Sequence, residues 1–229
     1  MLAIAAMLIP ISAALAAPVP EHPAQPASAQ LDTLLAKLAR PTPTQTPFVE
    51  LRGSALLKQP QRLQGRLQQP DAITLVREVT TPFHERTTIR AERVLIERYG
   101  NDGSKPRTRT FSLRRAPELG SLLASFTAML RGDRALLEKN YAVQMDGSAN
   151  LGSVGWRLQL TPRDPALQKR VSKIVMRGRG NALECMRLDQ PDGQHTLTLL
   201  GMTAVAAAKV SDASALNALC ETKPVASAL

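Results

Sequence analysis

The sequence predicts an α+β fold in which one large antiparallel sheet carries helices gathered on one face. Leucines recur at helical spacing in two segments, and short runs punctuated by glycine and proline fill two long regions. These signals follow one another as helix, strands, helices and strands, whereas a parallel α/β fold alternates single strands with helices. The length of 229 residues and the hydrophobic content of 44% suit a single domain with a substantial core.

The first sixteen residues are typical of a secretory signal peptide. They are uncharged and apolar, and they end in the small-x-small pattern Ala14-Leu15-Ala16, which suits cleavage after Ala16. No Lys or Arg precedes the run, which leaves open a start codon placed too late or a weak signal. A buried N-terminal helix is the alternative, which Pro10 disfavours. We expect residues 1–16 to be removed on export and residues 17–30, with four prolines, to form a flexible lead-in.

The first half of the remaining chain places strands between helices. One apolar stripe, at positions i, i+3, i+4 and i+7 of a helix, is formed by Leu31, Leu34, Leu35 and Leu38. Five or six short strands are expected between Phe48 and Leu113, with a hairpin turn at Asn101–Gly103. A second stripe predicts a helical insert at Leu119, Leu122, Leu123, Phe126 and Leu130. Asp133 is expected to cap a further short helix that runs through Lys139.

A second strand-rich region runs from Tyr141 to Met202 and leads into a short helix at Ser211–Cys220. The clearest alternation places Trp156, Leu158 and Leu160 on one face of a strand. Five strands are expected, at residues 141–145, 156–161, 171–177, 183–188 and 196–202, with hairpin turns at 178–181 and 191–193. We therefore expect one domain over residues 31–220, followed by a tail at 221–229.

The chain has two cysteines, Cys185 in a predicted strand and Cys220 at the end of the last predicted helix. An exported compartment permits a disulfide between them, and two separate buried thiols are the alternative.

No residue pattern points to catalysis or to a metal. The three histidines are isolated, no C-x-x-C or G-x-S-x-G occurs, and the carboxylates are scattered. We therefore expect neither an enzyme nor a cofactor, and an extracytoplasmic hydrolase is the least supported alternative. The net charge of +10 attracts anionic partners. Aromatic residues are only 3% and the basic residues are spread over the strands, which favours transient contact with an anionic membrane over nucleic acid.

Five motifs, by their order and spacing along the chain, resemble the LolA-like outer-membrane lipoprotein carrier family of Gram-negative bacteria. The strongest is the WRLQLTPRD stretch Trp156–Asp164, similar to that family's W-x-x-L-x-P-K-D. The others are Phe48–Glu50, Gly65–Pro70, Thr80–Pro82 and Leu130–Asp133, the last followed by Glu138 and Tyr141. The resemblance covers about residues 31–202 and is closer to a LolA-related branch than to the main carrier. The family's third strand carries an arginine followed by an aromatic residue. Here Arg77, in the stretch Leu75–Val79, is the only candidate for that arginine, and no aromatic residue follows it there.

The resemblance implies an unclosed β-barrel whose apolar concave face is covered by helices acting as a lid. It implies a monomeric periplasmic carrier that binds lipoprotein acyl chains or another lipid-like cargo for transfer toward the outer membrane. Its partners would include lipidated proteins and membrane transport proteins of the inner and outer membranes. The residues expected to line the cargo cavity are Leu31, Leu34, Leu38, Leu75, Val79, Leu122, Phe126, Leu130, Trp156, Leu158 and Met186.

Arg77 is expected to hold the lid closed through helix-end carbonyls if it faces inward, and a solvated surface arginine is the alternative. The alternative function is a periplasmic sensor or adaptor that binds a protein partner. Such a protein would have an exposed apolar patch on the outer face of the sheet and little cavity volume.

Overall fold

The computed structural model describes residues 27–39, 41–53, 59–100, 102–115, 132–147 and 155–221, which contain one eleven-stranded antiparallel sheet. The strand order is β6-β5-β4-β3-β2-β1-β11-β10-β9-β8-β7. The strands are β1 (Thr44–Arg52), β2 (Gln61–Asp71), β3 (Thr74–Thr81), β4 (His84–Arg90), β5 (Arg93–Tyr99), β6 (Arg107–Ser112), β7 (Tyr141–Gly147), β8 (Gly155–Pro162), β9 (Lys173–Arg179), β10 (Ala182–Asp189) and β11 (His195–Leu200).

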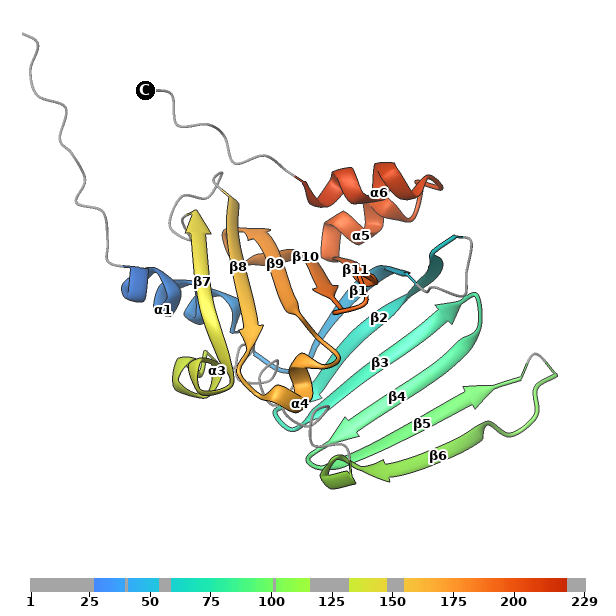
Figure 1. Ribbon diagram of the computed structural model, residues 1–229. Coiled ribbons are helices and arrows are strands. Elements are labelled where there is room, and N and C mark those ends of the chain that lie inside the picture. The colour runs from blue at the N-terminus through green and yellow to red at the C-terminus, as the bar shows by residue number, and fades with distance from the viewer. Residues whose placement is uncertain are drawn as a thin grey trace, which may run out of the picture.

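The sheet consists of two meanders, β1–β6 and β7–β11, that meet where β1 pairs with β11. This central register places Phe48 opposite Leu200 and Arg52 opposite Thr196. The outermost strands, β6 and β7, lie at opposite ends of the strand order, and Figure 1 shows the sheet curving between them without closing. The predicted large, curved and unclosed antiparallel sheet is therefore confirmed.

The helices are α1 (Ala27–Leu38), α3 (Arg134–Asn140), α4 (Pro165–Gln168), α5 (Gly201–Ala207) and α6 (Ala213–Cys220), with a 3₁₀ turn at Leu113–Arg115. The predicted cap of α3 is present, since the Asp133 carboxylate accepts a hydrogen bond of 3.0 Å from the Leu136 backbone N–H. Helix α1 begins at Ala27, inside the segment 17–30 expected to be an extended lead-in. The four prolines of that segment end at Pro26, and no proline interrupts Ala27–Leu38. No helix among the described residues is long and apolar enough to cross a bilayer.

The helices cover both faces of the sheet, so the expectation that they gather on one face was wrong for α5 and α6. We call the face that carries Leu158 and Met176 the inner face, and α1, α3 and α4 pack there. The opposite, outer face carries Cys185 and Leu199, and α5 and α6 pack against it. The physical reason is that β1 is buried on both sides over Phe48–Leu51 and therefore needs cover on both faces.

The inner-face core lies beneath α1. All four leucines of the predicted stripe are buried there, together with apolar side chains of α3, α4, β8 and β9. Trp156 anchors this core, and its indole N–H donates a hydrogen bond of 3.1 Å to the Gly180 carbonyl in the turn between β9 and β10. The predicted turn at 178–181 is therefore present, with Gly180 and Asn181 joining the two strands.

Two other predicted elements differ from the structure. The hairpin between β5 and β6 spans residues 100–106, longer than the predicted turn at 101–103, of which Asn101 lies outside the described residues. The strand expected at 196–202 ends at Leu200, because Gly201 takes a positive φ of 58° and turns the chain into α5. The predicted signal peptide and the leucine-rich insert with Leu122, Phe126 and Leu130 also lie outside the described residues.

On the outer face of β3, the buried carboxylate of Glu78 forms an ion pair with the half-exposed side chain of Arg66. Its carboxylate accepts a hydrogen bond of 2.8 Å from Arg66 Nε and lies 3.3 Å from His84 Nε2. Burial alone raises the pKa of Glu78, but the hydrogen bonds from Arg66 and His84 outweigh burial and hold this pKa below its usual 4.5.

Because the folded-state pKa of Glu78 is lowered, its ionisation stabilises the fold above the unfolded-state pKa, and this contribution is lost as pH falls through the folded-state pKa. We expect Glu78→Gln to lower the free energy of unfolding most at neutral pH, with the difference from wild type shrinking as pH falls below 4.5. Urea unfolding across this pH range measures it. A difference that stays constant or grows on acidification would contradict the assignment.

Candidate functional site

An apolar pocket of about 430 Å³ lies at the end of β11, where the inner-face core meets α5. Its walls come from the end of α1, the beginning of β1, the hairpin of β2 and β3, the start of β10 and the first turns of α5. The residues that line this apolar pocket are Leu38, Thr44, Gln45, Thr46, Pro47, Leu67, Gln68, Gln69, Leu75, Asn181, Ala182, Leu183, Glu184, Leu200, Gly201, Met202 and Val205.

The strand register explains why a pocket forms here. Strand β2 pairs with β1 from Arg52 to Thr44, whereas the pairing of β11 with β1 stops where Leu200 meets Phe48. The residues Thr44–Pro47 therefore run past the end of β11, and the pocket lies between them and the start of β10. Side chains from β2 and β3 supply its apolar wall, which includes Leu67 and Leu75.

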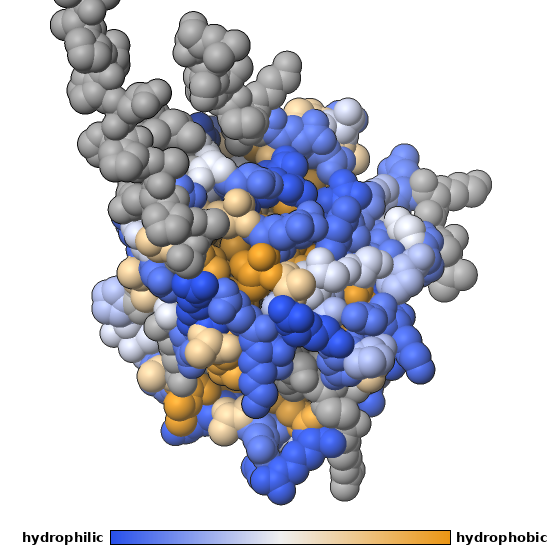
Figure 2. Space-filling model, turned by 60° about the vertical axis from the view of Figure 1, so that its left-hand side comes forward, coloured by the Kyte–Doolittle hydropathy of each residue, from blue (hydrophilic) through white to orange (hydrophobic). Residues whose placement is uncertain are grey.

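The mouth of the apolar pocket exposes large apolar side chains. Met202 is 81% exposed and Val205 is 45% exposed, and both lie on α5. The only other large hydrophobic residue exposed to this degree among the described residues is Ile73, which does not line the pocket. Figure 2 shows a face of the molecule on which apolar side chains gather in a hollow bordered by hydrophilic ones. An apolar surface open to water is suited to an apolar ligand.

The structure places the predicted cargo residues in different surroundings. Leu38 and Leu75 line the apolar pocket. Leu31 and Leu34 of α1 are buried in the inner-face core with Trp156 and Leu158 of β8, and Met186 packs against this core. Val79 is buried in a separate cluster with Phe48 and Leu63. A cargo-binding role for these residues stays a prediction, as it does for Leu122, Phe126 and Leu130 outside the described residues.

Sequence reasoning missed most of the pocket, including Leu67, Leu183, Leu200 and the exposed residues of α5. One local signal was available: the leucine-rich stretch Leu197–Leu200 is followed at once by a glycine, which can end a strand and turn the chain. The depth of the pocket follows instead from how far β1 extends beyond β11, and this depends on pairing between distant segments.

Arg77 faces the inner side of the sheet, where it meets a buried carboxylate. Its Nη2 donates a hydrogen bond of 3.1 Å to Glu50 Oε1, and its guanidinium carbon lies 4.9 Å from the centre of the Phe48 ring. Arg52 donates to the same oxygen of Glu50 at 2.8 Å. Arg77 is thus held by sheet residues in these contacts, and its predicted bond to a lid helix stays a prediction.

Cys185 of β10 and Cys220 of α6 form a disulfide. Two arginines hold α5 and α6 against the outer face of the sheet. Arg177 Nη1 donates a hydrogen bond of 3.0 Å to the Cys220 carbonyl at the end of α6. Arg62 Nη2 donates one of 2.8 Å to the Ala207 carbonyl at the end of α5. The α5 wall of the apolar pocket is therefore held to the sheet by the charge-assisted bond from Arg62, while Arg177 and the disulfide hold α6.

Among the described residues, no group of three His, Cys, Asp or Glu side chains is placed to hold a metal ion. The leucine, methionine and valine side chains that line the apolar pocket suit binding by burial of apolar surface.

A family model for outer membrane lipoprotein carrier proteins of the LolA-like type matches residues 23–223. The chain belongs to this LolA-like family. The resemblance drawn from Trp156–Asp164 is thereby confirmed, and the match extends beyond it at both ends. No protein of curated function matches the sequence significantly.

Solved structures similar to this LolA-like protein include the LolA superfamily protein NE2245 from Nitrosomonas europaea, at 10% identity and a TM-score of 0.37, covering 78% of this chain and 92% of that one. MucB of Pseudomonas aeruginosa, solved in a complex with MucA, is 16% identical with a TM-score of 0.38. That match covers 87% of this chain but only 63% of the MucB chain. LprF from Mycobacterium bovis is 14% identical with a TM-score of 0.35, covering 76% of this chain and 91% of that one.

Proposed function

We propose that this LolA-like protein is a periplasmic carrier that binds a lipid-like cargo, such as the acyl chains of a lipoprotein, for transfer toward the outer membrane. The observation that carries the proposal is the apolar pocket, whose mouth exposes Met202 and Val205 to solvent. Export through residues 1–16 belongs to the same proposal.

The dimensions and lining of the apolar pocket support this function. Its volume of about 430 Å³ lies in the range of small-molecule sites, roughly 300–1,000 Å³. Each buried CH₂ of an acyl chain contributes about 0.8 kcal/mol, so partial insertion of a chain supplies useful affinity. Leu and Met side chains supply no strong directional contact, and the flexible thioether of Met202 adapts to chains of different shape. The net charge of +10 favours encounter with anionic membranes that hold the cargo.

The adaptor alternative requires an exposed apolar patch for a protein partner. Of the three large exposed apolar residues in the described part of the chain, Met202 and Val205 line the apolar pocket. Because the adaptor is expected to have little cavity volume, the pocket volume of about 430 Å³ favours the carrier. Lipid extraction of protein purified without detergent, compared with capture of periplasmic proteins, separates the two functions.

We expect Val205→Glu to weaken binding of the fluorescent probe 1-N-phenylnaphthylamine by about tenfold or more, since a charge at the mouth must lose water when the probe enters. Val205 is 45% exposed, so the fold should tolerate the change. Fluorescence titration at constant protein concentration measures the probe affinity.

Ile73→Glu is the matched control, because Ile73 is a β-branched residue that is 53% exposed and lies outside the pocket lining. It should bind the probe like wild type. Equal probe affinity in the folded Val205→Glu variant and in wild type would count against the apolar pocket as the cargo site.

A further inference from the structure

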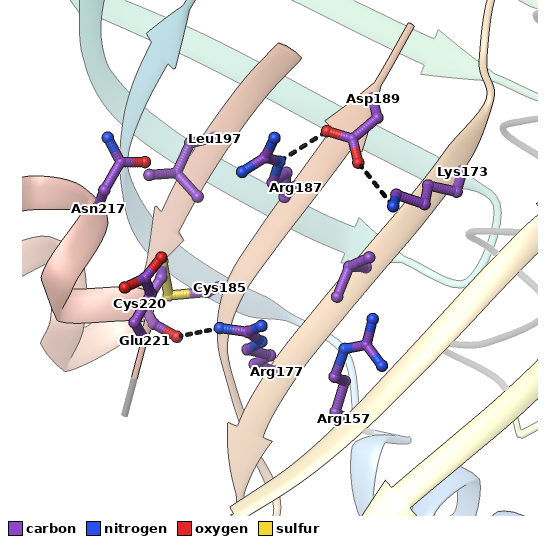
Figure 3. Close-up of a pocket in the computed structure, with 11 residues that line it drawn as sticks. Arg157, Lys173, Arg177, Cys185, Arg187, Asp189, Leu197, Asn217, Cys220 and Glu221 are labelled. Carbon is purple, nitrogen blue, oxygen red and sulfur yellow. Dashed lines mark hydrogen bonds and ion pairs between the residues drawn. A yellow bond between two sulfur atoms is a disulfide. The ribbon is translucent and has the colours of Figure 1, made fainter. Parts of the chain in front are cut away.

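A second concavity lies on the outer face of the sheet, beside α6. This outer groove has a volume of about 240 Å³ and is bordered by four cationic residues, Arg157, Lys173, Arg177 and Arg187. The acidic residues at its border are Asp189 and Glu221. Figure 3 shows these side chains projecting from β8, β9 and β10 on one side of the sheet, with the end of α6 along one margin. Among the described residues, the outer groove and the apolar pocket share no lining residue.

The strand register concentrates positive charge in the outer groove. Arg157 of β8 lies directly opposite Arg177 of β9, and such like-charged neighbours on adjacent strands destabilise a sheet. Arg187 lies on β10 opposite Val175, one row further along the outer face. Three guanidinium groups are therefore held close to one another although repulsion opposes the arrangement.

The partners within the protein leave this charge only partly balanced. Arg177 is bonded to the neutral Cys220 carbonyl, and Asp189 is shared between Arg187 Nε at 2.6 Å and Lys173 Nζ at 3.6 Å. Arg157 donates to Asp146 at 2.9 Å and to Gln159 at 2.8 Å. Its Nε, however, is buried and has no hydrogen-bond partner among the described residues. A buried N–H of a charged group without an acceptor is costly, so this guanidinium is not fully satisfied by its partners in the described part of the chain.

The floor of the outer groove strengthens attraction to an anion. Leu197 and Val175 are buried apolar residues, and the disulfide between Cys185 and Cys220 lies beside them. Such a floor excludes water from one side of the cations, which increases their electrostatic interaction with a ligand. Guanidinium groups match the oxygens of a phosphate group in pairs, which a single ammonium cannot do.

We propose that the outer groove is a binding site for a phosphate group, held by Arg157 and Arg187 with Arg177 and Lys173 as supporting charges. The phosphate belongs to a small soluble phosphate ester or to a phospholipid headgroup, which present the same oxygens. This site does not depend on the proposed carrier function. In a carrier, it would add recognition of an anionic headgroup on the face opposite α1.

The test uses the whole exported chain and the double variant Arg157→Gln/Arg187→Gln. Both side chains are partly exposed, at 36% and 47%, so the variant should fold, and Arg177 is left to hold α6. The matched control is Arg90→Gln/Arg93→Gln, which removes two charges from another cross-strand arginine pair, at the turn between β4 and β5. Circular dichroism verifies that both variants are folded.

Inorganic phosphate is titrated at low salt and binding is followed by calorimetry. We expect wild type and control to bind alike and the groove variant to bind about tenfold more weakly or worse. Absence of binding to wild type, or equal weakening in both variants, would overturn the proposal.

A second arm distinguishes the source of the phosphate. Vesicles of phosphatidylglycerol in phosphatidylcholine are compared with vesicles of phosphatidylcholine alone, with and without competing glycerol 3-phosphate. Flotation that depends on phosphatidylglycerol and is lost in the groove variant but not in the control supports a lipid headgroup. Binding of glycerol 3-phosphate without flotation supports a soluble ester. If neither the binding of glycerol 3-phosphate nor the flotation is weakened in the groove variant, the proposed site is wrong.

Discussion

Gly178→Ala is expected to lower the free energy of unfolding by about 3 kcal/mol or more, because an added methyl group has no room and the atoms that block it cannot yield. A Cβ at Gly178 would lie 1.9 Å from the Ala182 carbonyl oxygen and 2.5 Å from Cζ2 of Trp156. The first is backbone of the neighbouring strand, and the second belongs to a side chain that is 2% exposed in the inner-face core. Urea unfolding followed by the fluorescence of this single tryptophan measures the loss.

Gly155→Ala is the matched control on the adjacent strand. The nearest atom to a Cβ at Gly155 is the Gly178 carbonyl oxygen, at an ordinary distance of 3.6 Å. We expect this variant to change the free energy of unfolding by less than about 0.5 kcal/mol. Equal losses in the two variants would show that β8 and β9 do not pack around Trp156 as described.

The second large effect is expected from the disulfide. The variant Cys185→Ser/Cys220→Ser should lose about 4 kcal/mol of stability, since the bond closes a chain segment with a sequence separation of 35 residues and fixes α6 to β10. Comparison of unfolding midpoints in urea, with and without reductant, measures this contribution. The double variant serves as its own control, because reductant should not change its midpoint. A wild-type protein whose midpoint is equally insensitive to reductant would contradict the expectation.

Features that depend on local pattern could be predicted from the sequence. The stripe of α1, the Asp133 cap and the alternation Trp156-Leu158-Leu160 each follow from a period or a cap within a few residues. The large antiparallel sheet followed from the order of these segments. Helix α5 was missed because Leu197–Ala208 is mostly apolar, interrupted only by Thr198, Gly201 and Thr203, and shows no clear period that separates strand from helix until the φ of Gly201 is known.

Features that depend on register could not be predicted. The apolar pocket exists because β11 stops at Leu200 while β1 continues to Thr44, and the outer groove exists because Arg157 meets Arg177. Each arises from the alignment of two strands, and a shift of one residue would send the side chains to the opposite face. The inward orientation of Arg77 was left open for the same reason.

The pairing of β1 with β11 also constrains the order of folding. Phe48 and Leu200 are neighbours in the sheet but about 150 residues apart in the chain. The entropic cost of closing this long loop is therefore met in one late step, the pairing of β11 with β1. During synthesis or export from the N-terminus, β1 has β2 as a partner on one side, and its other edge stays bare until the last strand emerges. A truncation immediately before His195, which removes β11, would therefore leave two incomplete sheets, each with an open edge where the two meanders should join.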